Sequence, residues 1–387
     1  MGAPARGGGS VVRKEIETVL GKVIDRLRAL DLGDPFEPRA AAAIVDAGLH
    51  RLCVPASAGG LGATMVEAAE VLMAVGALDG ATALGFAMQV HVTGAMRDAS
   101  TFPEAIRDAI YRAIVADGAL VNNAATEEGG GSPARGAIPG TQATQAAAPD
   151  GTWRLTGEKT WTTWLPNLTH AFVTARVGAD DPAEVGIFLV DLATDGVQRG
   201  EGFEAMGMRG SASGRLVLDG ALATLVQRRR IDAPDPRGAA PMAWFAIAIA
   251  AAYLGVGEGA RTAVARWALD RRPGDGSTSV ADVPSVQLRL GRLDAELRAA
   301  RIVVLDVARR WDEDRDASDV ALAKLVATRA AVNATDEALR IAGGPGFLAG
   351  RLERAFRDAR AGLINPPLED VALTGFGKAV LGRERPS

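Results

Sequence analysis

The stretch of sequence that decides the fold lies near the C-terminus and reads RDARAGLINPPLED, residues 357–370. It begins with alternating basic and acidic side chains, carries a pair of prolines near its centre and ends on Glu369 and Asp370. A proline side chain cannot accept a proton, whereas a carboxylate can. Just beyond the prolines, Glu369 and Asp370 are therefore candidates for a proton-transfer role. Both are equally compatible with surface acids at the start of a helix, where the helix dipole favours them.

The bulk composition restricts the class of function. With 387 residues, 48% hydrophobic and 23% charged, the chain fits two or three packed units of a soluble globular protein. Its net charge of -4 argues against nucleic-acid binding, which needs a basic surface. The basic run at residues 228–230 is read as a solvated loop or a partner contact. The single cysteine, Cys53, forms no intrachain disulfide, which suits a cytoplasmic protein.

The most apolar stretch of the chain is residues 241–257. It is slightly short for a membrane span and rich in alanine, so it predicts a helix buried inside a bundle. We therefore expect no membrane segment.

Hydrophobic periodicity divides the chain into three parts. Apolar residues spaced three and four apart predict helices through the first 117 residues. Short apolar runs bounded by glycines and acids predict strands, with an exposed loop at residues 138–149. The helical period returns from residue 241. The sequence thus predicts a mostly α chain with a central β domain (α+β), divided at 1–117, 118–232 and 233–387. It lacks the strand–helix alternation of a nicotinamide-dinucleotide fold.

Two motifs in the middle part suit a flat, phosphate-bearing ligand. Residues 125–132 read ATEEGGGS, and a glycine-rich turn lets backbone N–H groups approach a phosphate. Residues 157–163 read GEKTWTT, in which a Trp beside hydroxyl groups offers an apolar wall and hydrogen bonds. Each motif alone is also compatible with a plain surface turn or a half-buried strand.

Taken together, in this order and at this spacing, the two motifs resemble the acyl-CoA dehydrogenase family. The start of the segment at residues 357–370 resembles that family's R-D-A-K/R run. Residues 206–213 and 341–347 resemble its M-G-x-R-x-S and F-G-G-x-G-F segments. The resemblance implies an N-terminal helical domain, a middle β-barrel-like domain and a C-terminal four-helix bundle. It also implies FAD as the cofactor, no metal, and a homodimer or homotetramer.

The resemblance further implies which residues contact FAD and substrate. Flavin contacts would come from Ala125, Thr126, Gly131, Ser132, Trp161 and Thr163. A neighbouring subunit would add Arg271, Arg340, Gly343 and Gly344, with the Arg271 fork on the pyrophosphate. Ser132 and His91 would border the substrate, although a buried, bonded core histidine is the more common role for a residue such as His91.

The catalytic carboxylate of the family is missing. Its position on the tail is Pro366 here, and the alternative position near residues 244–248 has no acid. Desaturation of a thioester needs a base to take the α-proton while hydride passes to flavin. Three explanations stay open: Glu369 or Asp370 folds back as the base, the flavin chemistry needs no such base, or another chain completes the site.

We therefore expect an FAD-dependent oxidoreductase that desaturates the Cα–Cβ bond of an acyl thioester in fatty acid metabolism. Its acyl carrier would be CoA or a carrier protein, and an electron-transfer partner would reoxidise the flavin. The alternatives are a flavin-dependent monooxygenase with the same fold and a non-catalytic flavoprotein subunit of a hetero-oligomer.

Overall fold

The computed structural model describes residues 12–129, 137–146, 152–179, 183–274 and 276–384. Its first part is helical, as the periodicity predicts, and caps fix several of the helix starts. Thr64 and Glu67 form a reciprocal capping box at the start of α3, which satisfies two otherwise free N–H groups. The helices are α1 (Lys14–Arg28), α2 (Pro38–Asp46), α3 (Met65–Gly76), α4 (Gly80–Asp98) and α5 (Glu104–Asp117).

The middle part forms one sheet that closes on itself. Its strands are β1 (Val121–Ala124), β2 (Gln142–Gln145), β3 (Trp153–Thr162), β4 (His170–Val177), β5 (Glu184–Asp191), β6 (Val197–Gly202) and β7 (Gly214–Arg230). The strand order is β1-β4-β2-β3-β7-β5, and a further pairing of β4 with β5 closes the ring. This arrangement confirms the predicted barrel-like domain.

Two local predictions in this part are wrong. Within the expected loop at residues 138–149, residues 142–145 form strand β2, which pairs with both β3 and β4. Residues 228–230 are not a loop either: they end strand β7 and pair with residues 184–186 of β5. In both places the residues are polar and would be expected in an exposed loop, but hydrogen bonds to neighbouring strands hold them in the sheet.

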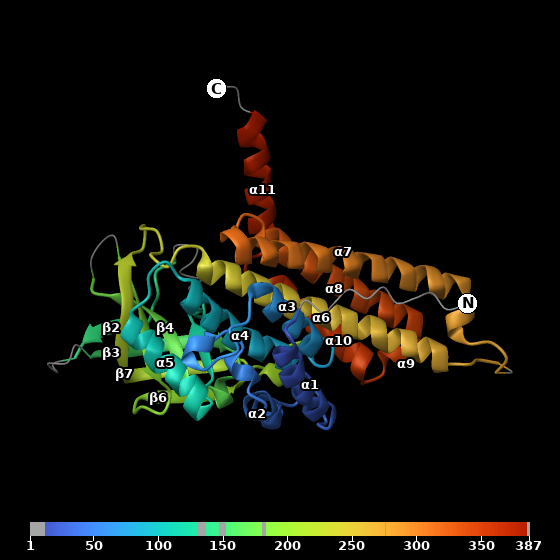
Figure 1. Ribbon diagram of the computed structural model, residues 1–387, viewed down its shortest axis with the longest axis horizontal. Coiled ribbons are helices and arrows are strands. Elements are labelled where there is room, and N and C mark those ends of the chain that lie inside the picture. The colour runs from blue at the N-terminus through green and yellow to red at the C-terminus, as the bar shows by residue number, and fades with distance from the viewer. Residues whose placement is uncertain (1–11, 130–136, 147–151, 180–182, 275, 385–387) are drawn as a thin grey trace.

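The last part is a bundle of long helices. Its elements are α6 (Ala240–Asp270), α7 (Pro284–Asp314), α8 (Val320–Ala342), α9 (Gly344–Phe347), α10 (Arg351–Ile364) and α11 (Glu369–Glu384). The four helices α6, α7, α8 and α10 pack together. Figure 1 shows the strands gathered at one end of these long helices and α11 projecting away from them. Helix α6 is long and apolar enough to cross a membrane, yet 83% of its most apolar window is buried inside the structure. The prediction of a buried core helix is confirmed.

The segment at residues 357–370, near the C-terminus, joins all three parts of the chain. Asp358 of α10 is buried, and its Oδ1 accepts a hydrogen bond from the backbone N–H of Met208. Arg357 donates to both carboxylate oxygens of Asp34 at 2.9 Å and to the carbonyl of Met206 at 3.0 Å. A Cβ on Gly207 would lie 2.3 Å from the carbonyl oxygen of Arg357, so glycine is required for this close approach. Helix α10 therefore fixes the β domain and the N-terminal helices on the bundle.

Replacing Asp358 tests this junction through its pH dependence. Burial raises the pKa of Asp358 to about 6, against the lowering effect of the Met208 N–H. The folded state therefore binds a proton more tightly than the unfolded state, and this contribution to stability grows as the pH falls below 6. Between pH 7 and pH 5 the wild type should gain about 1 kcal/mol of unfolding free energy relative to Asp358→Asn. Urea denaturation at both pH values measures the difference.

The control variant is Asp46→Asn, because the Asp46 side chain is 64% exposed. Its free energy of unfolding should change between the two pH values by the same amount as that of the wild type. If the difference in unfolding free energy between wild type and Asp358→Asn is the same at pH 7 and pH 5, the burial of an ionisable Asp358 is contradicted.

Candidate functional site

A cavity of about 480 Å³ lies where the three parts meet. Its walls come from α4, from strands β1, β3, β4, β5 and β7, from the first turns of α6, and from Asn365 and Pro366 of the tail. The volume falls within the usual range for small-molecule sites, which occur preferentially at domain junctions.

Trp161 forms one wall of this cavity. A bulge between Lys159 and Thr162 interrupts the pairing of β3 with β7, and Trp161 sits in it with a φ of 56°. A left-handed backbone is costly for a bulky residue, and bulges commonly redirect a side chain beside a functional site. The indole remains 51% exposed and packs 4.7 Å from the Phe203 ring. The fold thus maintains strain to present a flat aromatic surface.

A chain of hydroxyl groups continues from this wall. Thr163 Oγ1 lies 2.9 Å from Ser213 Oγ, which lies 2.9 Å from Ser211 Oγ. The side-chain amide of Asn122 donates to the carbonyl of Thr163 at 3.1 Å. These bonds hold Thr163, which lines the cavity, in a fixed position.

The segment around Thr126 is held by a buried ion pair. Lys159 is fully buried, and its ammonium group donates to Oε1 of Glu127. The same oxygen accepts from the N–H and the hydroxyl of Thr141 at 3.0 and 2.6 Å, while the N–H of Thr160 donates to the carbonyl of Thr126 at 2.9 Å. A buried ammonium without its carboxylate is costly, so this pair fixes the bend at residues 125–127.

The opposite side of the cavity carries polar side chains that are mostly neutralised. Arg237 donates through Nε and Nη2 to both oxygens of Asp235, and Gln227 donates to Asp235 as well. Burial opposes ionisation of Asp235, but these bonds outweigh it and lower its pKa. Burial, with a smaller contribution from Arg237, lowers the pKa of His91 to about 3, so its imidazole is neutral.

The structure brings five of the thirteen site residues expected from the sequence to the cavity, together with Pro366 at the family's base position. The cavity is lined by His91, Ala125, Thr126, Trp161, Thr163 and Pro366. Gly131 and Ser132 lie outside the described residues. Glu369 starts helix α11, is tied to Arg329 of α8 by an ion pair, and does not line the cavity; nor does Asp370, which is exposed. The hypothesis that either acid folds back as a base finds no support in this placement.

The remaining cofactor candidates lie at the far end of the bundle. Arg271 directly follows α6, whereas Pro241 and Phe245 of its first turns line the cavity. Because α6 has 31 residues, its two ends are about 46 Å apart. Arg340, Gly343 and Gly344 lie at the Arg271 end, where the last turn of α8 packs on the last turns of α6. No single flavin in the cavity can touch both groups of residues within one chain.

Sequence reasoning missed Asn123, Gln227, Asp235 and Arg237, which also line the cavity. Asp235 and Arg237 belong to the loop between β7 and α6. In the sequence they are marked by an Asp-Pro-Arg run in front of the most apolar helix. Among the described residues, no group of three or more His, Cys, Asp or Glu side chains is placed to hold a metal ion.

Comparison with known proteins gives consistent results. The family model for the acyl-CoA dehydrogenase middle domain matches residues 122–221, and the model for the acyl-CoA dehydrogenase C-terminal domain matches residues 239–365. The chain is 32% identical over 364 residues to the putative acyl-CoA dehydrogenase YdbM of Bacillus subtilis (strain 168), covering 92% of this chain and 93% of that protein.

Three solved structures are similar over nearly the whole chain. KijD3, solved with FMN and dTDP-3-amino-2,3,6-trideoxy-4-keto-3-methyl-D-glucose, is 25% identical with a TM-score of 0.81, over 97% of this chain and 96% of that one. Butyryl-CoA dehydrogenase from Megasphaera elsdenii is 20% identical with a TM-score of 0.82, over 96% and 100%. Dibenzothiophene monooxygenase (TdsC) from Paenibacillus sp. A11-2 is 20% identical with a TM-score of 0.75, over 96% and 96%.

The cavity suits the ring of a flavin. An isoalloxazine is flat, apolar on its faces and rich in hydrogen-bonding groups at its edges. Trp161 offers a half-exposed aromatic face, and Thr126 and Thr163 line the same cavity with hydroxyl groups. The described residues therefore fit a flavin.

We expect Glu127→Gln to weaken flavin binding at least about ten-fold, because Lys159 would lose its carboxylate and the bend at residues 125–127 would loosen. Titration of the apoprotein with FMN and FAD, followed by quenching of flavin fluorescence, measures the dissociation constants. The neighbouring Glu128 is the matched control, since its side chain is 76% exposed and, within the described part of the chain, pairs with the surface Arg215. Equal dissociation constants for Glu127→Gln and Glu128→Gln would contradict a positioning role of the buried pair.

Proposed function

This chain belongs to the acyl-CoA dehydrogenase family, and from that premise we propose that it is a flavin-dependent monooxygenase. It would insert one oxygen atom of O₂ into an organic substrate. The other oxygen atom leaves as water, and reduced flavin supplies the two electrons. We prefer this function to thioester desaturation because desaturation needs a free base, and the acids around the cavity are engaged in hydrogen bonds and ion pairs.

The observation that carries the proposal is the state of the acids around the cavity. Asp235 is the one carboxylate among the described lining residues, and hydrogen bonds from Arg237 and Gln227 occupy both of its oxygens. Glu369 is engaged by Arg329 outside the cavity. Neutral His91 with its low pKa is a weak base. Abstraction of an α-proton from a thioester therefore has no free acceptor among the described residues that line the cavity.

Oxygen transfer places fewer demands on these residues. It requires a substrate and a reduced flavin held together in a water-poor space, with hydrogen bonds to orient them. Leu84, Met88 and Phe245 give the cavity apolar walls, and the neutral His91 and Asn123 can orient a ligand without abstracting a proton. The similarity to a dibenzothiophene monooxygenase supports this assignment at the level of the fold.

Thioester desaturation remains the second candidate, favoured by the position of Asp235. This carboxylate lines the cavity, so movement of Arg237 would free one oxygen to act as a base. The hydride would then pass to the flavin, as in dehydrogenases generally.

Two half-reactions separate the candidates. We expect the oxidised, flavin-loaded protein to keep its yellow absorbance when straight-chain acyl-CoA thioesters are added without oxygen, because the described lining of the cavity offers no free base. We expect the chemically reduced protein to incorporate one atom from ¹⁸O₂ into substrate, which mass spectrometry detects. An aryl sulfide and an indole are suitable first substrates.

Anaerobic bleaching by a thioester, lost in Asp235→Asn, would establish the second candidate and overturn the first. If neither half-reaction proceeds while the flavin stays bound, a role as a flavoprotein subunit of a larger assembly is the remaining alternative.

We further propose that the flavin is FAD and that a second copy of the chain completes its site. Arg271 lies about 46 Å along α6 from the cavity of its own chain. An Arg can bind the pyrophosphate of FAD but finds none in FMN. Arg271→Ala should therefore weaken FAD binding at least about ten-fold and leave FMN binding unchanged.

Mixed oligomers test whether Arg271 acts across subunits. Trp161→Gly should abolish flavin binding in its own cavity, and glycine accepts the left-handed backbone at that position. If the two variants are co-refolded in equal amounts as random dimers, about a quarter of the sites regain both Trp161 and Arg271. FAD retention at about that level is the expected result. Retention no higher than the sum of the separate variants would contradict the shared site.

A further inference from the structure

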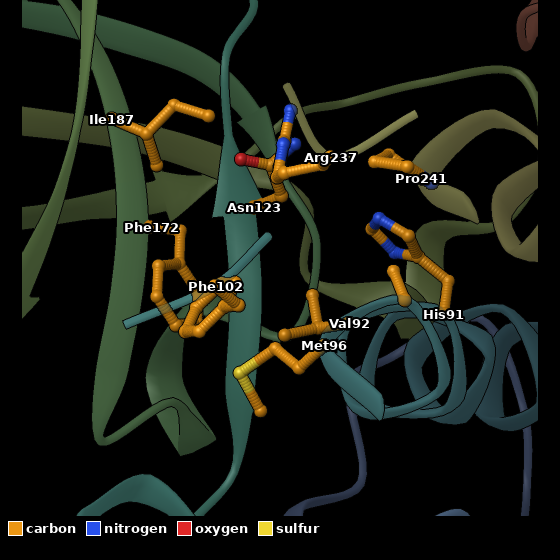
Figure 2. A pocket seen from close by; sticks show the side chains of 10 residues that line it. His91, Val92, Met96, Phe102, Asn123, Phe172, Ile187, Arg237 and Pro241 are labelled. Carbon is orange, nitrogen blue, oxygen red and sulfur yellow. The ribbon is translucent and has the colours of Figure 1, made fainter. Parts of the chain in front are cut away.

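A small recess, here called the annex, opens beside the main cavity (Figure 2). Its volume is about 30 Å³, enough for one water molecule or a group of two or three heavy atoms. His91, Asn123 and Arg237 line both the annex and the main cavity, whereas Met96 and Phe102 line the annex alone. The annex is therefore a mostly apolar pocket with three polar groups at its entrance.

Two of these polar groups are buried without a partner. Nδ1 of His91 and Oδ1 of Asn123 have no hydrogen-bond partner within the described part of the chain. The His91 side chain is held in place by edge-to-face packing on Phe245, with ring centroids 5.1 Å apart. Unpaired polar atoms of this kind are rare in folded proteins and call for a ligand or a bound water. In Figure 2, Asn123 and Arg237 lie close together, with the Asn123 oxygen on the Ile187 side, and the His91 ring lies on their other side near Pro241.

The charge at the annex decides which ligand it suits. Asp235 neutralises Arg237 by a two-point contact, and its pairing uses Nε and Nη2 of the guanidinium. His91 is uncharged because burial disfavours its protonation. A carboxylate entering the annex would meet no uncompensated positive charge and would lose its hydration. An uncharged group that both donates and accepts hydrogen bonds meets the polar side chains of His91, Asn123 and Arg237 instead.

We propose that the annex binds a hydroxyl or carboxamide group carried by the substrate, through His91, Asn123 and Arg237. The apolar body of the substrate would lie in the main cavity against Phe245, Met88 and Leu84. The substrate class is thus an uncharged hydroxylated or amidated compound, aromatic or otherwise apolar elsewhere. This rests on the proposed function only in placing the substrate in the same cavity as the flavin.

Four small aromatic probes separate the possibilities without any turnover. Phenol and benzamide carry the proposed groups, toluene replaces them with a methyl group, and benzoate replaces them with a charge. Each is titrated into the oxidised, flavin-loaded protein and followed by the change in flavin absorbance and by calorimetry. We expect phenol or benzamide to bind at least about ten-fold more tightly than toluene, the usual effect of a hydrogen bond to an otherwise unpaired group. Benzoate should bind no better than toluene.

Variants of the annex link this preference to its residues. His91→Leu should abolish the preference for phenol or benzamide over toluene, and His91→Gln, which keeps a hydrogen-bonding group, should restore part of it. Met96→Leu is the control, because it conserves volume on the apolar side of the annex and should leave the preference intact.

Equal binding of phenol, benzamide and toluene would overturn the proposal and leave the annex as a water site only. Tightest binding by benzoate would overturn it in favour of an anion site. The comparison of probes in the wild type stands even if a His91 variant fails to fold. If the preference holds but no ¹⁸O₂ is incorporated, the monooxygenase proposal fails and the annex proposal survives.

Discussion

The buried carboxylate of Asp358 is the constraint on which the arrangement of the site depends. It accepts the N–H of Met208, while the neighbouring Arg357 holds Asp34 and the carbonyl of Met206, so one turn of α10 joins all three parts. With α10 fixed, Asn365 donates to the hydroxyl of Tyr253 on α6 and Pro366 lines the cavity. The chain then leaves along α11, which turns Glu369 toward Arg329. The geometry that closes the cavity thus removes the tail acids from it.

What remains inside the cavity is polar, and Arg229 is the one charged group there that no carboxylate among the described residues pairs with. Trp161 is strained into the position of a flat wall, and the Glu127–Lys159 pair secures the bend beside it. On the other side, Asp235 and Arg237 neutralise each other, and His91 stays neutral. Such a set of groups orients and encloses reactants well but moves protons poorly. Membership of a family named for dehydrogenation therefore does not by itself decide the chemistry.

The sequence predicts most of the fold because helical periodicity is strong and the motifs mark the junctions. It fails where neighbours in space decide the outcome. Strand β2 was missed because its Gln- and Thr-rich residues become a strand only by pairing with β3 and β4. Glu369 seemed close to the site because only a few residues separate it from Pro366. The spacing does not reveal the direction in which helix α11 leaves the bundle, and that direction takes Glu369 away from the cavity (Figure 1). Asp235 and Arg237 reach the cavity from a loop whose path no local pattern reveals.

The assignment to oxygen chemistry depends on the described residues of the cavity offering no available base, and exchange of hydrogen at Cα tests this most directly. The oxidised, flavin-loaded protein is mixed with butanoyl-CoA in D₂O, and deuterium at Cα is followed by NMR spectroscopy. A dehydrogenase base would remove and return this proton many times before any hydride leaves. We expect exchange at the rate of the protein-free buffer. Catalysed exchange, above all if Asp235→Asn abolishes it, would show that a base operates in the cavity and would contradict the assignment to oxygen chemistry.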